Sequence, residues 1–298
     1  NNGFPLTNSS ASVITNGAYM VIKPGTHTLK VRYWVKDVAT NVEGTITKTY
    51  PSSSYASNTY YDMTANLDVK NYDGNHYYMW DAQQNYWSGH EWNSANPWQP
   101  VLNNNSNSNY AQSNSDPRYY NESYPTHSAY SCETLPNANE MSWYCVYGDP
   151  RWDADELWTT MGHLYKGGMW FKKMSVLQAE NHYDIEKSAN GSLDIRKTWT
   201  NYINSSSSIK SGVPSAADAG NYFYLPALGN YQSGHLSGVG SYGSYWSSTV
   251  YPMFSGHAVA LTFTKEYVFV SNYRCDFGYI VETSQEFLRF HANDDNPI

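Results

Sequence analysis

The chain has 298 residues, a net charge of −8 and 15% charged residues, against about 25% in a typical soluble protein. Aromatic residues make up 16% of the chain, and this excludes an intrinsically disordered protein, because such chains contain few aromatics. The negative charge argues against a nucleic-acid partner, which would need a basic surface. The longest largely apolar run, Ala258–Phe263, is far shorter than the about 20 residues of a membrane-spanning helix, so we expect no membrane span.

Residues 1–72 have the pattern of β-strands. We expect three strands, at Thr26–Val38, Gly44–Tyr50 and Tyr60–Tyr72. In the first, the apolar residues alternate with polar ones, as in a strand that is buried on one face only; they are Leu29, Val31, Tyr33 and Val35. Three strands make an incomplete sandwich, so we expect them to be completed by further strands upstream or by packing on the rest of the chain.

The character of the chain changes at the turn-forming cluster Asn71–Asn75, where we place a domain boundary. The second domain, residues 73–298, begins with a stretch rich in Trp, Tyr and Asn that shows little periodicity. We expect helices at Asn139–Tyr147 and Asp153–Leu164, the second with acidic residues at the positive end of its dipole. Short strands follow, so the predicted fold class is α+β.

Near the end of the chain, two strands are expected to form a hairpin. His257–Thr264 and Tyr267–Ser271 are separated only by Lys265 and Glu266, the length of a tight turn. Antiparallel pairing would bring the residues before 258 beside those after 270. Both loops would then lie at the end of the sheet opposite the turn.

The three cysteines leave two alternatives open. Cys132 and Cys145 are 13 positions apart and flank a turn, so they could form a disulfide that leaves Cys275 unpaired, or all three could be free thiols. No Cys/His cluster has the spacing of a zinc site.

Four segments of the last hundred residues resemble the terminal half of a C-type-lectin-like fold: Gly243–Thr249, Ala258–Phe263, Val268–Arg274 and Gly278–Val281. Similar modules occur in bacterial surface proteins, including the variable proteins of diversity-generating retroelements. Residues 1–72 more weakly resemble the closing strands of a fimbrillin, the subunit of type V pili. The resemblance implies a C-type-lectin-like module at 73–298, preceded by part of an antiparallel β-sandwich at 1–72.

This combination implies an extracellular adhesin or pilus-tip protein on a bacterial outer surface, lipid-anchored or pilus-associated. Its partners would be a protein or glycan ligand on another cell or host surface and other pilus subunits. A structural pilus subunit with a non-binding head is the alternative, and a hydrolase is a third possibility. No Gly-x-Ser-x-Gly motif frames a serine, and the related formylglycine-generating enzyme needs two late cysteines where this chain has only Cys275. We therefore predict no enzyme activity.

Calcium-dependent lectins of this fold carry Trp-Asn-Asp, whereas Trp92, Asn93 and Ser94 lack the aspartate. We therefore expect no metal site and no cofactor. The resemblance implies ligand contacts in the two loops at the end of the predicted hairpin, where aromatic and small polar side chains would form one exposed, antibody-like binding face. The predicted ligand-binding residues are Tyr251, Met253, Phe254, His257, Ser271, Asn272, Tyr273, Cys275 and Asp276. Most of these types are reachable from an Asn codon by adenine replacement, so active diversification of the gene is a further hypothesis; Met253 is an exception.

Overall fold

The computed structural model describes residues 17–63, 66–120, 122 and 127–282. Its described residues form two compact units. The residues up to Val35 and those from Thr45 to Asp68 belong to the first unit, and the remaining residues, including the hairpin tip Lys36–Gly44, belong to the second.

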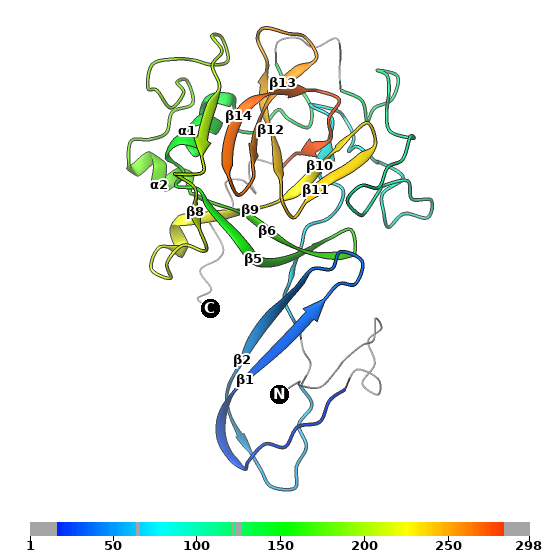
Figure 1. Ribbon diagram of the computed structural model, residues 1–298, viewed down its shortest axis with the longest axis vertical. Coiled ribbons are helices and arrows are strands. Elements are labelled where there is room, and N and C mark those ends of the chain that lie inside the picture. The colour runs from blue at the N-terminus through cyan, green and yellow to red at the C-terminus, as the bar shows by residue number, and fades with distance from the viewer. Residues whose placement is uncertain (1–16, 64–65, 121, 123–126, 283–298) are drawn as a thin grey trace. The chain divides into compact units, whose positions relative to one another are not determined.

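The first unit contains most of a two-stranded sheet, formed by β1 (Gly25–Lys36) and β2 (Glu43–Tyr55) (Figure 1). Half-buried and exposed side chains alternate along β1 from Thr26 onward and along β2 as far as Tyr50, as the sequence pattern predicted. On the half-buried face the hydroxyl groups of Tyr33 and Tyr50 lie 3.2 Å apart.

The strand expected at Tyr60–Tyr72 is wrong for the described residues of that range, of which only Lys70–Asn71 (β3) are in a strand. The backbone of Asp68 has a φ of 50°, in the left-handed region, and its N–H donates to the side chain of Asn66 (3.2 Å). This local turn interrupts the extended conformation. The Asp68 N–H bonds to the nearby Asn66 side chain instead of to the backbone of a neighbouring strand.

The second unit is rich in strands, as expected for a sheet-rich fold. A six-stranded sheet has the order β4 (Tyr77–Tyr78), β15 (Tyr279–Ile280), β12 (Gly243–Val250), β13 (His257–Phe263), β14 (Tyr267–Arg274) and β7 (Tyr202–Ser205). A second sheet has the order β3, β5 (Arg151–Thr160), β6 (His163–Lys172) and β9 (Tyr222–Pro226), with β8 (Lys210–Ser211) also paired to β5. A separate hairpin consists of β10 (Leu228–Gln232) and β11 (His235–Val239).

The helix expected at 139–147 is confirmed as α1 (Ala138–Tyr147), which packs against β12, β13 and β14 (Figure 1). Asn137 caps its first turn: the Asn137 side chain accepts from the Glu140 N–H at 3.1 Å, and the Glu140 carboxylate accepts from the Asn137 N–H at 2.7 Å. This reciprocal capping box satisfies two backbone donors at the start of the helix.

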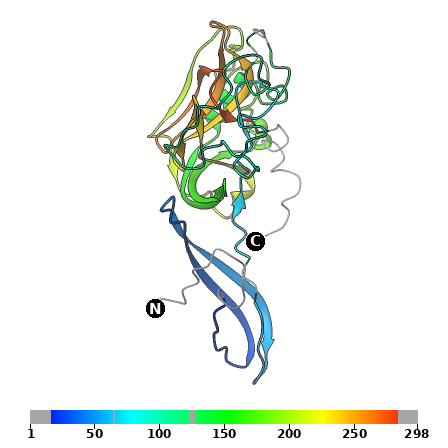
Figure 2. The same ribbon diagram turned by 90° about the vertical axis from the view of Figure 1, so that its right-hand side faces the viewer.

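The helix expected at 153–164 is wrong. This segment forms the antiparallel hairpin of β5 and β6, which turns at Met161 and Gly162 with φ values of 48° and 77°. Two residues with positive φ are characteristic of the tight hairpin turns that match strand twist. The register shifts between Asp153 and Leu157, and the green hairpin is strongly curved in Figure 2.

The acidic residues that suggested a helix start have a different role. Asp153 is 3% exposed, and its carboxylate accepts hydrogen bonds from the backbone N–H groups of Asp155 (3.0 Å) and Glu156 (3.1 Å). Its second oxygen accepts from the indole N–H of Trp170 at 3.1 Å. The carboxylate therefore satisfies backbone donors in the irregular part of β5. The short helix α2 (Met174–Ala179) follows β6, and one 3₁₀ turn (Ala219–Asn221) precedes β9.

Two buried clusters hold the second unit together, and they place the cysteines apart. Cys145 lies in the larger cluster with α1, whereas Cys132 and Cys275 lie in the smaller one with Trp246. All three cysteines are buried free thiols, so the disulfide between Cys132 and Cys145 is wrong.

Candidate ligand-binding site

The four strands β12, β13, β14 and β7 place their loops at one end of the six-stranded sheet. The expected hairpin is confirmed: His257 pairs with Arg274 and Phe263 with Val268 in an antiparallel register. Cys275 N–H donates to Gly256 O at 2.9 Å, which holds the loop before β13 beside the loop after β14. The loop before β13 and the loop after β14 therefore lie side by side, as the prediction of a common loop surface requires.

Four rings and one methionine side chain occupy this end of the sheet, and we call them the aromatic end surface. Its members are Trp199, Tyr251, Met253, Phe254 and His257. The ring centroids of Trp199 and Tyr251 are 5.0 Å apart at 86°, and those of Tyr251 and Phe254 are 5.8 Å apart. The Phe254 and His257 centroids are 6.2 Å apart.

Within this surface the side chains differ in exposure. Met253 and Phe254 are 63% and 61% exposed, as the prediction required. Tyr251 is only 7% exposed, so its predicted exposed position is wrong. Its hydroxyl donates to the Met253 sulfur (3.5 Å), and its N–H donates to His257 O (3.0 Å). Tyr251 thus lies beneath the exposed Met253 and Phe254 side chains and contacts both.

The predicted residues of β14 do not all lie on one face of the sheet. Strand β14 continues to Arg274, so the side chains of Ser271, Asn272 and Tyr273 alternate between the two faces of the sheet. The partners of Ser271 and Tyr273 are Ala260 and Ala258, which belong to the smaller buried cluster, whereas Asn272 pairs with Val259 of the larger one. The expectation of one common exposed face is therefore wrong for these three residues.

Cys275 and Asp276 lie after the strand but do not present free ligand groups. Cys275 is 3% exposed within the smaller cluster, so its predicted exposure is wrong, and burial raises the pKa of its thiol. The half-buried Asp276 accepts two hydrogen bonds from the Arg274 guanidinium, at 2.9 and 2.5 Å. Arg274 remains well exposed, and the hydrogen bonds to Asp276 raise its pKa.

Trp199 and Asn201 belong to this end of the sheet but were missed from the sequence. Asn201 accepts from the Trp199 indole N–H at 3.1 Å and from the Ser271 hydroxyl at 3.2 Å, so it ties Trp199 to β14. Both lie some fifty residues before the other members in the chain. The one available signal was a tryptophan within a polar segment next to a short strand.

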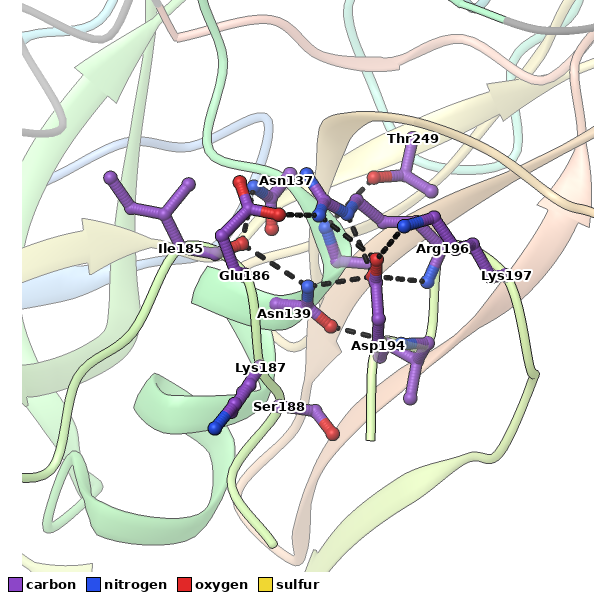
Figure 3. A network of polar contacts seen from close by, with 12 residues as sticks. Asn137, Asn139, Ile185, Glu186, Lys187, Ser188, Asp194, Arg196, Lys197 and Thr249 are labelled. Carbon is purple, nitrogen blue, oxygen red and sulfur yellow. Dashed lines mark hydrogen bonds and ion pairs between the residues drawn. The ribbon is translucent and has the colours of Figure 1, made fainter. Parts of the chain in front are cut away.

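A polar network beneath the surface fixes the chain segments that carry it (Figure 3). The buried side chain of Asn139 donates to Ile185 O (3.1 Å) and Asp194 Oδ1 (2.9 Å) and accepts from the Ile195 N–H (3.0 Å). Asp194 also accepts two hydrogen bonds from Arg196, which hold the Asp194 pKa well below its usual range. The segment leading to Trp199 is thereby attached to the start of α1.

The same helix start holds the segment leading to Tyr251. The Ala138 N–H donates to Thr249 Oγ1 at 2.9 Å, and the Ser248 N–H donates to Pro136 O at 3.1 Å. Thr249 and the network of Asp194 therefore meet at the first turn of α1, as Figure 3 shows. The segments that carry Trp199 and Tyr251 are thus both attached to the first turn of α1.

The chemistry of the surface suits recognition by stacking and packing. The exposed Phe254 ring and Met253 side chain favour contact with a partner that removes them from water. Among the described residues His257 Nδ1 is buried without a hydrogen-bond partner, which leaves one polar group beside the rings. No group of three His, Cys, Asp or Glu side chains in the described part of the chain could hold a metal ion.

Comparison of the chain with protein-family models, curated proteins and solved structures gave no match in any of the three. The resemblance to a C-type-lectin-like module and to a fimbrillin therefore stays a prediction. Of the helices in the described residues, none has the length and apolar character needed to span a membrane.

Proposed function

We propose that this chain is a non-enzymatic adhesin of the bacterial outer surface, whose second unit is a C-type-lectin-like head that binds a protein or glycan ligand without calcium. The observation that carries the proposal is the pair of exposed side chains Met253 and Phe254, at 63% and 61% exposure, on a surface whose supporting segments are fixed by hydrogen bonds. The Phe254 ring is a rigid aromatic group on an ordered scaffold and can bind with little loss of conformational entropy, and the flexible Met253 side chain can adapt to an apolar partner.

The proposal places the ligand contact on Met253 and Phe254, supported from below by Tyr251 and from the side by Trp199. A direct test measures binding of the purified protein to a glycan array and to a panel of immobilised collagen, fibronectin, fibrinogen and mucin. Changing Met253 and Phe254 together to Ser should reduce a positive signal at least about tenfold, a loss of about 1.4 kcal/mol of binding free energy.

The matched control is Val213→Ser, because Val213 is also exposed (59%) and lies outside the aromatic end surface. It should leave binding unchanged. Thermal melts of all variants should overlay that of the wild type, because exposed side chains contribute little to the core. Undiminished binding by the Met253/Phe254 double variant would refute the proposed site.

A structural pilus subunit is the second candidate, and one observation favours it. The half-buried face of the β1–β2 sheet carries Leu29, Val31 and Tyr33, and no second sheet covers it within the described residues of the first unit. Two-stranded sheets are marginal alone and gain stability from further strands. Sedimentation distinguishes the two: a subunit would self-associate, and Val31→Asp would abolish that association while leaving ligand binding intact.

A further inference from the structure

A second site lies at the opposite end of α1 from the polar network of Figure 3. A cavity of about 590 Å³ is lined by residues from the end of α1, the starts of β5 and β9, the end of β6, α2, β7 and β8. This volume is within the range of about 300–1,000 Å³ that is usual for small-molecule sites. Six of its fourteen lining residues are charged, in a chain with only 15% charged residues.

One wall of the cavity has a surplus positive charge. Asp149 lies between two cations: its Oδ1 is 2.6 Å from Lys210 Nζ, and its Oδ2 is 3.2 Å from the Arg151 guanidinium. The Tyr222 hydroxyl donates to the same carboxylate at 2.7 Å. Burial acts to raise the pKa of Asp149, but these contacts outweigh it and hold the pKa below its usual value. One carboxylate against two cations leaves a net charge of about +1.

The chain turns at Asp149, directly after α1 and before β5. Asp149 has a φ of 47°, in the left-handed region that aspartate and asparagine adopt more often than other non-glycine residues. Its three polar contacts keep the carboxylate fixed and leave the outer side of Lys210, which is 53% exposed, open to the cavity.

Another part of the lining has the opposite charge. Asp218 is exposed, its carboxylate accepts from the Ser215 hydroxyl at 2.7 Å, and it makes no ion pair with any described residue. The last two charged residues, Lys172 and Glu180, neutralise each other at 2.6 and 2.8 Å. Val146 and Val176 add an apolar strip from the two helices.

We propose that this cavity binds a small zwitterion with an apolar side chain, a free amino acid or a short peptide. The ligand carboxylate faces Lys210 and Arg151, its ammonium group faces Asp218, and its side chain lies on Val146 and Val176. A neutral apolar ligand would leave the charges of the cavity without new partners, and a simple anion or cation would satisfy one wall and be repelled by the other.

Isothermal titration with leucine, the dipeptide Leu-Leu, leucine methyl ester and N-acetyl-leucine tests this assignment on the whole chain. Leucine or the dipeptide should bind, and the better of the two identifies the source of the zwitterion. The methyl ester lacks the carboxylate and N-acetyl-leucine lacks the ammonium group, so each should bind at least about tenfold more weakly.

Asp218→Asn should weaken leucine binding but not the already weak binding of N-acetyl-leucine. The matched control is Asp62→Asn, an exposed carboxylate of the first unit. Phe254→Ser should leave leucine binding unchanged, so this site and the aromatic end surface are tested independently. The proposal is overturned if neither leucine nor the dipeptide binds, if the two blocked derivatives bind as well as leucine, or if Asp218→Asn has no effect.

Discussion

Replacement of Asn139 by alanine tests whether the polar network of Figure 3 holds the loops of the second unit. Asn139 is fully buried, and its side chain makes three hydrogen bonds, to Ile185 O, the Asp194 carboxylate and the Ile195 N–H. The helix cap is made by Asn137 and Glu140, so the substitution leaves the capping box intact. The measured effect therefore reports the contacts of the loop rather than the start of α1.

The magnitude follows from the three contacts. Each of the two bonds with neutral backbone groups contributes about 0.5–1.5 kcal/mol, and the bond to the Asp194 carboxylate about 1.5–3 kcal/mol. Asn139→Ala should therefore lower the free energy of unfolding by about 2.5–6 kcal/mol. Solvent cannot replace the contact to the Ile195 N–H, which is buried, whereas the partly buried Ile185 O and Asp194 carboxylate can recover part of theirs from water, so the lower half of this range is the more realistic expectation.

Urea unfolding followed by tryptophan fluorescence measures this difference, because the midpoint falls while the slope stays constant if only stability changes. Asn75→Ala is the matched control; Asn75 is exposed and makes one weak side-chain contact of 3.5 Å, so its replacement should cost no more than about 0.5 kcal/mol. An effect of Asn139→Ala below about 1 kcal/mol would show that the network does not stabilise the loop.

Two further predictions concern the buried tryptophan Trp246 and the three buried cysteines. Trp246→Ala should cost about 3–5 kcal/mol in a thermal melt, because Trp246 is 1% exposed and its indole N–H donates to Tyr78 O at 2.9 Å; a melt that overlays the wild type would contradict this. An alkylating reagent should modify none of Cys132, Cys145 and Cys275 in the native protein and all three after denaturation, since burial raises the pKa of each thiol, that of Cys145 to about 12. Detection of a native disulfide by mass spectrometry would disprove the assignment of free thiols.

The β13–β14 hairpin could be predicted because its pattern is local. The apolar run at 258–263 and the two-residue turn Lys265–Glu266 determine pairing and register without help from distant residues. The helix α1 was predictable for the same reason, since a polar cap precedes its buried face. Local chemistry and the final structure agree in both elements.

The β5–β6 hairpin could not be predicted from local chemistry. Acidic residues at 153–156 have the composition of a helix start, but Asp153 is buried and bonded to Trp170, which lies on the neighbouring strand. A tertiary contact between residues 17 positions apart therefore decides the conformation. Sequence periodicity contains no direct signal for such a contact.

The sequence predicted where the candidate site lies in the fold, but it did not predict correctly which residues belong to it. The predicted strand Tyr267–Ser271 ended three residues before the end of β14, so Asn272 and Tyr273 were expected in a loop and were grouped with Ser271 on one face. Trp199 was missed because β7 pairs with β14 from a distant part of the chain. The ends of strands and the pairing of strands that are distant in the chain are the features that are hardest to predict from a single sequence.

Two groups of ion pairs lie at the ends of irregular segments of the second unit. Arg196 pairs with Asp194 and Glu186 in the loop before β7, and Asp149, in the turn between α1 and β5, pairs with Arg151 and Lys210. Charged hydrogen bonds are the stronger ones, so a small number can fix a long loop. The exposed tips above that framework can then vary without loss of the fold. We therefore expect substitutions at the exposed residues Met253 and Phe254 to leave the contacts among Asn139, Asp194 and Arg196 unchanged.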